Sequence, residues 1–357
     1  MEEQLTPMMQ KYLETKNEYK DCILFYRLGD FYEMFFEDAK CASKELELTL
    51  TGKSCGLKER APMCGVPFHS AEGYITRLVS KGYKVAICEQ VEDPKLAKGL
   101  VKREVVRIVT PGTNCNLEAL DESKNNYLMG VVAMDDLFGI SVVDVTTGEY
   151  RLTEVDTLGK LLDEINKFMP SELICNESFY ISGVDIEDLK ERLGISVSSL
   201  APHYFDEECC KKSLCRHFSV QTLDGLGLAD YSVGITAAGA VMEYLEETQK
   251  TSLAHILELV PYKVGKYMLL DRNTRRNLEL VETLREKKKR GSLLWVLDRT
   301  RTAMGARKLR NTLEQPFIQK EEILKRFDAI DELNANLEEI LTKVEEDAKK
   351  LYIETER

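Results

Sequence analysis

The sequence predicts a multidomain protein of the α+β and α/β type, with two small mixed modules followed by an incomplete all-α segment. Three observations support this prediction. The 357 residues are enough for two or three domains. Strand-like apolar runs alternate with amphipathic helix patterns as far as about residue 250. Beyond that point long charged helices dominate, and their apolar faces have few partners within the chain.

The first module is expected to span residues 1–113, because alternating strand and helix patterns end at the Pro111-Gly112 break. Glycines and prolines spread through 51–68 predict a long loop. Ser70 is a candidate N-cap. Apolar and β-branched runs predict strands at 22–27, 31–36, 85–89 and 105–110, and helical spacing predicts helices at 2–20, 38–46 and 70–81.

A charged linker over 114–126 separates this module from a second one over 127–250. Turns at Asp135-Asp136 and Thr147-Gly148 join three short antiparallel strands, and helices then alternate with one more strand. This order indicates a mixed sheet with helices on its faces. The strands are predicted at 128–135, 139–146, 148–155 and 172–175, and the helices at 158–169, 186–193 and 235–249.

The third segment, 251–357, is expected to be helical and truncated. Its exposed apolar helix faces predict association or poor solubility. The helices are predicted at 275–285, 293–313, 321–334 and 335–357.

Composition and charge narrow the class of protein. There are 49 basic and 61 acidic residues, a net charge of −12, so bulk charge does not favour nucleic acid. A local basic surplus lies in 51–110, with 11 basic and 6 acidic residues. No apolar run is long enough to cross a membrane, and no secretion signal opens the chain, so we expect a cytoplasmic, nucleoid-associated protein. The ten cysteines form no C-x-x-C pair and are expected to be reduced, without a metal.

Gly52-Lys53-Ser54 resembles the end of a phosphate-binding P-loop. Such a loop needs a glycine where this sequence has Glu47, whose carboxylate would repel phosphate. The sequence therefore predicts no ATP site, no cofactor and no enzymatic activity in this chain.

The aromatic segment at 31–36 is the most unusual part of the sequence. Strand alternation places Phe31, Glu33 and Phe35 on one face, and a carboxylate between two phenylalanines does not suit a buried face. An outward-facing phenylalanine can wedge between stacked bases, and a carboxylate beside it can accept a hydrogen bond from a base. The alternative is an ordinary aromatic core strand with a solvated glutamate.

The segment Phe25-Tyr26-Arg27-Leu28-Gly29-Asp30-Phe31-Tyr32-Glu33-Met34-Phe35 resembles the mismatch-reading motif of the MutS family of DNA mismatch repair proteins. The resemblance covers about residues 1–340. Further segments that resemble the family are 62–69 (PMCGVPFH), 85–90 (VAICEQ), 107–113 (RIVTPGT), 271–279 (DRNTRRNLE) and 304–307 (MGAR).

The resemblance implies a mismatch-binding domain over 1–113, an RNase H-like connector over 127–250 and the start of a lever or core domain over 251–357. It implies that Phe31 stacks on the mispaired base of kinked DNA and that Glu33 hydrogen-bonds that base. Candidate contacts to the DNA backbone are Lys53, Arg60, His69, Arg103 and Arg107.

The resemblance also implies partners: mismatched or looped double-stranded DNA, a second copy of the full-length protein, and a repair protein docked on the connector. The full-length family binds ATP and Mg²⁺ in an ATPase domain. This chain lacks that domain and the clamp domain, so we expect it to be a part of a longer protein.

Two alternative functions remain open. The first is an RNase H-like nuclease using Asp135, Asp144, Glu149 and Asp156 on two metal ions. The second is a docking module that does not bind DNA.

Overall fold

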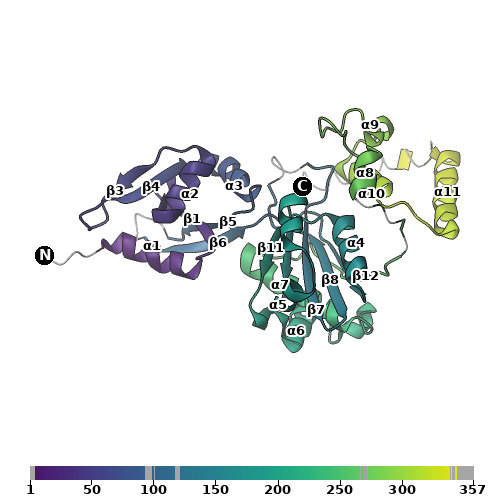
Figure 1. Cartoon of the computed structure of the whole chain (residues 1–357), viewed down its shortest axis with the longest axis horizontal. Coiled ribbons are helices and arrows are strands. Elements are labelled where there is room, and N and C mark those ends of the chain that lie inside the picture. Colours follow the sequence, from purple (N-terminus) through teal and green to yellow (C-terminus); the bar gives the residue numbers. More distant parts are fainter. Residues whose placement is uncertain are drawn as a thin grey trace. The chain divides into compact units, whose positions relative to one another are not determined.

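The computed structural model describes residues 5–92, 99, 101–116, 121–265, 267, 268, 270, 272–337, 339, 342 and 343. The chain divides into two compact units, one of residues 1–263 with 299–308 and one of residues 264–298 with 309–357. The first unit contains two six-stranded sheets, each with helices packed on it (Figure 1). The predicted fold class, mixed modules followed by a helical segment, is confirmed.

The first sheet has the strand order β3-β4-β2-β1-β5-β6. β1 runs parallel to β5, and the other neighbours are antiparallel. β1 lies in the interior of the sheet, and its apolar residues are buried on both faces, as in a sheet covered on both sides. The strands are β1 (Cys22–Leu28), β2 (Phe31–Phe35), β3 (Thr51–Lys53), β4 (Ala61–Pro67), β5 (Lys84–Gln90) and β6 (Arg103–Val109).

Helices cover the two faces of this sheet. α1 (Pro7–Glu18) buries Met9 and Tyr12 in a cluster that includes Phe35. On the other face, α2 (Phe36–Leu46) and α3 (Ala71–Val79) pack in a cluster that includes Met34. Successive residues of β2 therefore enter different cores, because strand side chains alternate between faces.

Two predictions for this module are wrong. Residues 51–68 are not one long loop, because β3 and β4 form there and β4 pairs with β2 in register from Phe31↔Pro67 to Phe35↔Met63. The prolines are tolerated because Pro67 ends β4 and Pro62 lies beyond the residues that pair with β2. Ser70 does not cap α3 through its side chain, because its hydroxyl donates to the Pro67 carbonyl at 3.2 Å.

The second sheet has the order β11-β10-β7-β8-β9-β12. β7, β8 and β9 form an antiparallel meander, and β10 and β11 follow parallel to β7. This is the connectivity expected of an RNase H-like module. The strands are β7 (Tyr127–Met134), β8 (Leu137–Asp144), β9 (Glu149–Val155), β10 (Glu172–Cys175), β11 (Ser196–Ser199) and β12 (Val260–Pro261).

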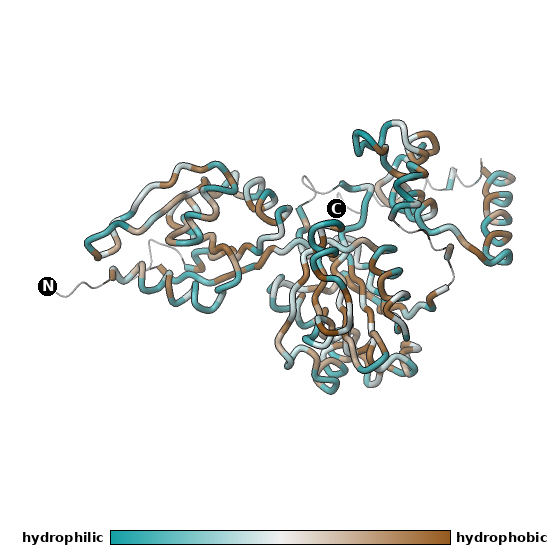
Figure 2. The backbone as a smooth tube through the Cα atoms, in the orientation of Figure 1, coloured by the Kyte–Doolittle hydropathy of each residue, from teal (hydrophilic) through white to brown (hydrophobic). Residues whose placement is uncertain are grey.

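The longest helix of this module, α7 (Ser232–Gln249), lies directly on β7 and β8. Two glycines permit the close approach: a Cβ at Gly139 would lie 2.2 Å from the Val233 carbonyl oxygen, and one at Gly130 would lie 2.4 Å from Val241. Figure 2 shows these strands as a strongly hydrophobic layer. The other helical elements are α4 (Leu158–Phe168), α5 (Glu177–Ile181), η2 (Asp188–Arg192), η3 (Pro202–Phe205), α6 (Glu207–Phe218) and η4 (Leu223–Leu226).

The later helices are shorter than predicted. The helix expected over 275–285 ends at Asn277, and Glu279 soon after it has a positive φ of 47°. The helix expected over 293–313 is broken at Asp298, whose backbone is extended. Most of the helix predicted over 335–357 lies outside the described residues. The elements are α8 (Arg272–Asn277), α9 (Leu293–Leu297), α10 (Ala303–Glu314) and α11 (Lys320–Ala335). In the part of the chain that the structure describes, no helix is long and apolar enough to cross a membrane.

Candidate nucleic-acid interface

The β1–β2 hairpin presents the aromatic segment singled out in the sequence. Its two-residue turn is Gly29-Asp30, and Leu28 pairs with Phe31 on either side of it. Gly29 has φ +61° and Asp30 does not have a positive φ, a pattern typical of a type II′ turn with glycine at its first central position. Phe31 is therefore the first strand residue after the turn.

Exposure separates Phe31 from the other aromatic residues of the segment. Phe31 is 46% exposed, whereas Tyr32 is 7% exposed and Phe35 is 1% exposed. Phe35 lies on the same strand face as Phe31 but is buried in the core beside Tyr12, with ring centroids 4.9 Å apart. The strand thus enters the core at Phe35 and leaves it at Phe31.

Several contacts hold this end of the sheet in place. The Phe68 amide donates to the Asp30 carbonyl at 3.0 Å, and the Arg27 guanidinium lies 3.8 Å from the centroid of the Phe68 ring. The Tyr32 hydroxyl donates to Glu89, and burial together with this acceptor raises the pKa of Tyr32 above its ordinary value. Phe68 is 43% exposed, so two exposed phenylalanines flank the turn.

Glu33 lies two residues beyond Phe31 and is partly buried. Its Oε2 forms an ion pair with Nζ of Lys53, at 2.5 Å, and Lys53 is the last residue of β3. Both residues are candidates from the sequence, which does not link them. Twenty residues separate them along the chain, so no local pattern could indicate this pair.

The other candidate backbone contacts differ in their surroundings. Arg60, before β4, and His69, beside Phe68, are exposed. Arg103 donates to the carbonyls of Arg27 and Val101 at 2.7 and 2.8 Å. Arg107 donates to the Thr113 carbonyl at 3.5 Å, and its buried Nε finds no hydrogen-bond partner among the described residues. Arg103 and Arg107 therefore make hydrogen bonds within the protein, whereas Arg60 is exposed.

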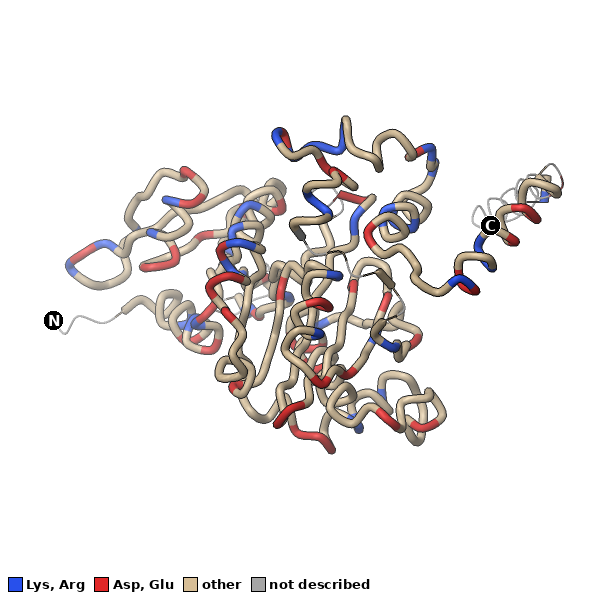
Figure 3. Tube along the Cα trace, turned by 45° about the vertical axis from the view of Figure 1, so that its right-hand side comes forward, with Lys and Arg blue, Asp and Glu red and all other residues tan. Residues whose placement is uncertain are grey.

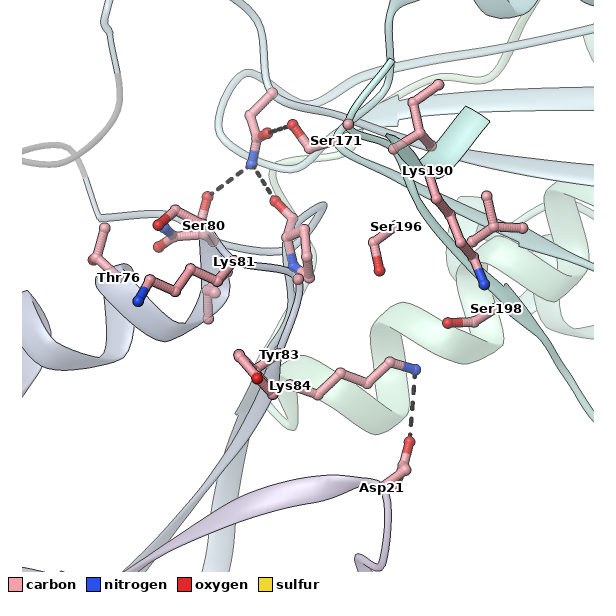
Figure 4. A pocket seen from close by; sticks show the side chains of 18 of the residues that line it. Asp21, Thr76, Ser80, Lys81, Tyr83, Lys84, Ser171, Lys190, Ser196 and Ser198 are labelled. Atoms are coloured by element: carbon pink, nitrogen blue, oxygen red, sulfur yellow. Dashed lines mark hydrogen bonds and ion pairs between the residues drawn. The ribbon is translucent and has the colours of Figure 1, made fainter. Parts of the chain in front are cut away.

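A cleft of about 1000 Å³ with a mixed polar and apolar lining lies in the first unit, between the α3 end of the first module and the β11 edge of the second (Figure 4). Its lining includes Lys81, Lys84 and Lys190. Lys84 extends toward Asp21, 3.6 Å away, and Lys81 pairs with Glu45 at 2.8 Å. No local sequence pattern predicts this cleft, because its walls come from separate modules.

Basic and acidic residues alternate along most of the chain. Figure 3 shows Lys and Arg interleaved with Asp and Glu along the tube. The aromatic hairpin is the distinctive feature of the first module.

The nuclease alternative is not favoured by the second sheet. Asp135 lies in the turn before the eight-residue strand β8, and Asp144 is the last residue of that strand, which at about 3.3 Å per residue places the two about 20 Å apart. The Asp144 side chain is buried and accepts from the Thr146 amide at 2.9 Å and from Asn125 at 2.7 Å. In a two-metal site the ions lie about 3.5–4 Å apart. Among the described residues, no group of three or more His, Cys, Asp and Glu side chains could hold a metal ion.

The fold and the exposed residues define a multidomain α/β protein in which an aromatic hairpin edge accompanies an RNase H-like module. Comparison with known families gives three matches in the same order along the chain: MutS domain I at residues 6–118, MutS domain II at 126–257 and MutS domain III at 273–356. Together they cover most of the chain, and the chain belongs to the MutS family.

Highly similar curated relatives carry the same family name. The chain is 65% identical over 334 residues to the DNA mismatch repair protein MutS of Lachnoclostridium phytofermentans, which covers 94% of this chain and 36% of the relative. It is 56% identical over 331 residues to that of Acetivibrio thermocellus, covering 92% and 38%. It is 55% identical over 332 residues to that of Ruminiclostridium cellulolyticum, also covering 92% and 38%. The chain thus spans little more than a third of the length of these relatives.

Proposed function

We propose that this chain recognises mismatched or looped double-stranded DNA and takes part in DNA mismatch repair. The observation that carries the proposal is Phe31, an exposed phenylalanine at the tip of a hairpin whose other aromatic side chains are buried. A mispaired step stacks weakly and kinks at low energetic cost, so a rigidly presented ring discriminates it from paired DNA. Membership of the MutS family and the names of the relatives support the proposal.

In this mechanism the Phe31 ring enters the minor groove and stacks on the mispaired base. Glu33 accepts a hydrogen bond from that base, on the same strand face. The Gly29-Asp30 turn and the Arg27–Phe68 contact limit how far the hairpin can move, which lowers the entropy lost on binding. Recognition then depends on deformability and not on base sequence.

The chain contributes recognition and not catalysis in this proposal, since its sequence holds no complete P-loop. We also propose that the complete protein is a homodimer and that its second module docks a repair partner. Among the described residues the edge strand β11 pairs with β10 alone, which supports a docking role, because an edge offers unpaired backbone groups. Sedimentation velocity at several concentrations tests the homodimer.

Fluorescence anisotropy tests mismatch recognition. A labelled duplex with one G·T mismatch or one unpaired T is compared with its matched duplex at low salt. The wild-type chain is expected to prefer the mismatched duplex, and Phe31→Ala is expected to reduce this preference by about tenfold, since stacking one base on an aromatic ring contributes ~1–3 kcal/mol. Leu57→Ala removes another exposed apolar side chain of the same module and should leave the preference unchanged. An unchanged preference in Phe31→Ala would overturn the proposal.

A further inference from the structure

The Lys53–Glu33 ion pair spans an entire intervening strand. Lys53 belongs to β3 and Glu33 to β2, and β4 lies between them in the sheet. The β4 residue opposite Glu33 is Gly65, where a Cβ would stand 3.5 Å from Cγ of Glu33 and 3.2 Å from the Tyr32 carbonyl oxygen. A glycine at this register position leaves room beside the Glu33 side chain, which any larger residue would contact.

The pair lies in a partly desolvated position. The Glu33 side chain is 17% exposed and the Lys53 side chain 33% exposed. The Lys53 ammonium also lies 5.6 Å from the centroid of the Phe35 ring, close enough for a cation–π contact. The lysine is therefore held beside the ring and the carboxylate together, in contrast to the exposed Arg60, which precedes β4.

The position of Glu33 creates an electrostatic problem for the proposed function. A lone carboxylate two residues from the wedge would be repelled by the DNA phosphates. In a partly buried site this repulsion is screened less than in bulk water. A cation at 2.5 Å offsets the charge and limits the rotamers that the glutamate can adopt.

We propose that Lys53 is a positioning residue for Glu33: it neutralises the carboxylate and fixes its orientation beside Phe31, so that Glu33 can approach the minor groove and accept from a mispaired base. The lysine engages Oε2, and Oε1 is the oxygen assigned to the base. This inference rests on the proposed function. It replaces the simpler role of Lys53 as a phosphate contact.

A double-mutant cycle distinguishes the two roles. The anisotropy assay is run on wild type, Lys53→Met, Glu33→Gln and the double variant, with mismatched and matched duplexes. If Lys53 acts through Glu33, Lys53→Met lowers the mismatch-to-matched affinity ratio by about fivefold in the wild type, in the usual range for coupled residues, and by less than about twofold in the Glu33→Gln background. Lys53→Arg is expected to restore most of the ratio.

Two results would contradict the positioning role of Lys53. A phosphate contact predicts that Lys53→Met weakens both duplexes alike in either background and lowers the salt dependence of log K by about 0.9, and this result would overturn the inference. So would a rise in mismatch affinity in Lys53→Met. Lys44→Met is the matched control, because this exposed lysine lies on α2, which packs against the other face of the sheet.

The same experiment separates this inference from the proposed function. Loss of preference in Phe31→Ala together with an additive Lys53/Glu33 cycle overturns only the role of Lys53. Retained preference in Phe31→Ala overturns both. Circular dichroism melting of each variant confirms that the comparison is made between folded proteins, and Lys53→Arg supplies a second variant that keeps the charge.

Discussion

The Tyr244 hydroxyl on α7 donates a hydrogen bond, 2.7 Å long, to Oε1 of the fully buried Glu172 on β10. The second oxygen of Glu172 accepts from the Gly112 amide at 3.0 Å and from the Thr110 hydroxyl. One buried carboxylate therefore joins the second module to the segment that leaves β6 of the first. Burial, with the neighbouring carboxylate, raises the pKa of Tyr244 well above its ordinary value.

Glu172→Ala is expected to lower the free energy of unfolding by about 3 kcal/mol, because three buried donors lose their acceptor. Tyr244→Phe removes one donor and is expected to cost about 1 kcal/mol. Urea titrations followed by fluorescence measure both, and Tyr180→Phe, at an exposed tyrosine, should leave the midpoint unchanged. A neutral Glu172→Ala would show that the network does not stabilise the fold.

Gly29→Ala is expected to destabilise the protein by about 1–2 kcal/mol, because Gly29 has φ +61° and a Cβ strains that conformation. No atom would clash with the new methyl group, so the effect isolates the backbone. Gly73→Ala in α3, also in open space, is the control and is expected to be neutral or stabilising by up to ~1 kcal/mol. Thermal melts of the two variants should therefore shift in different directions.

Arg60→Ala is expected to reduce the slope of log K against log salt by about 0.9, since an exposed arginine that contacts phosphate releases one counterion. Arg107→Ala removes the same charge but also an internal contact to the Thr113 carbonyl. We expect it to lower the melting temperature and to change the salt slope little. Titrations at four salt concentrations check both, and equal slopes for Arg60→Ala and wild type would exclude Arg60 as a phosphate contact.

Alkaline pH is expected to destabilise the fold through buried thiols. All ten cysteines lie in the described part of the chain and none is paired in a disulfide there. Burial is the main cause that raises the pKa of four of them to about 12, from an ordinary value of 9.0: Cys22, Cys88, Cys175 and Cys210.

The sign follows from where the proton is held. Above pH 9 the unfolded chain ionises these thiols and the folded chain does not, so the stability present below pH 9 is lost as pH rises toward 12. Each thiol contributes about 1.4 kcal/mol per pH unit in that window. Urea midpoints at pH 8, 9 and 10 measure the slope. Cys88→Ala is expected to reduce the slope of the unfolding free energy against pH by the contribution of one thiol, although the cavity lowers stability at every pH. An unchanged slope would argue against the linkage.

The sequence by itself determined the features that depend on neighbouring residues. β-branched and apolar runs located β1, β5, β6 and the β7–β8–β9 meander, because strand preference and turn chemistry are local. Strand alternation left an outward-facing Phe31 and a buried one both open, the resemblance to the MutS family favoured the outward-facing one, and Phe31 is exposed. The division at 1–113, 114–126 and 127–250 and the functional roles of Phe31 and Glu33 stay predictions.

Only the tertiary structure decided the rest. β3 and β4 form within a stretch rich in glycine and proline because pairing with β2 supplies the hydrogen bonds that local preference does not. The Lys53–Glu33 pair and the Glu172 network join residues 20 and 60 or more positions apart. Local patterns report which face a side chain occupies, whereas partners across a sheet or between modules are set by chain topology, so the immediate surroundings of Glu33 became visible only in the folded chain.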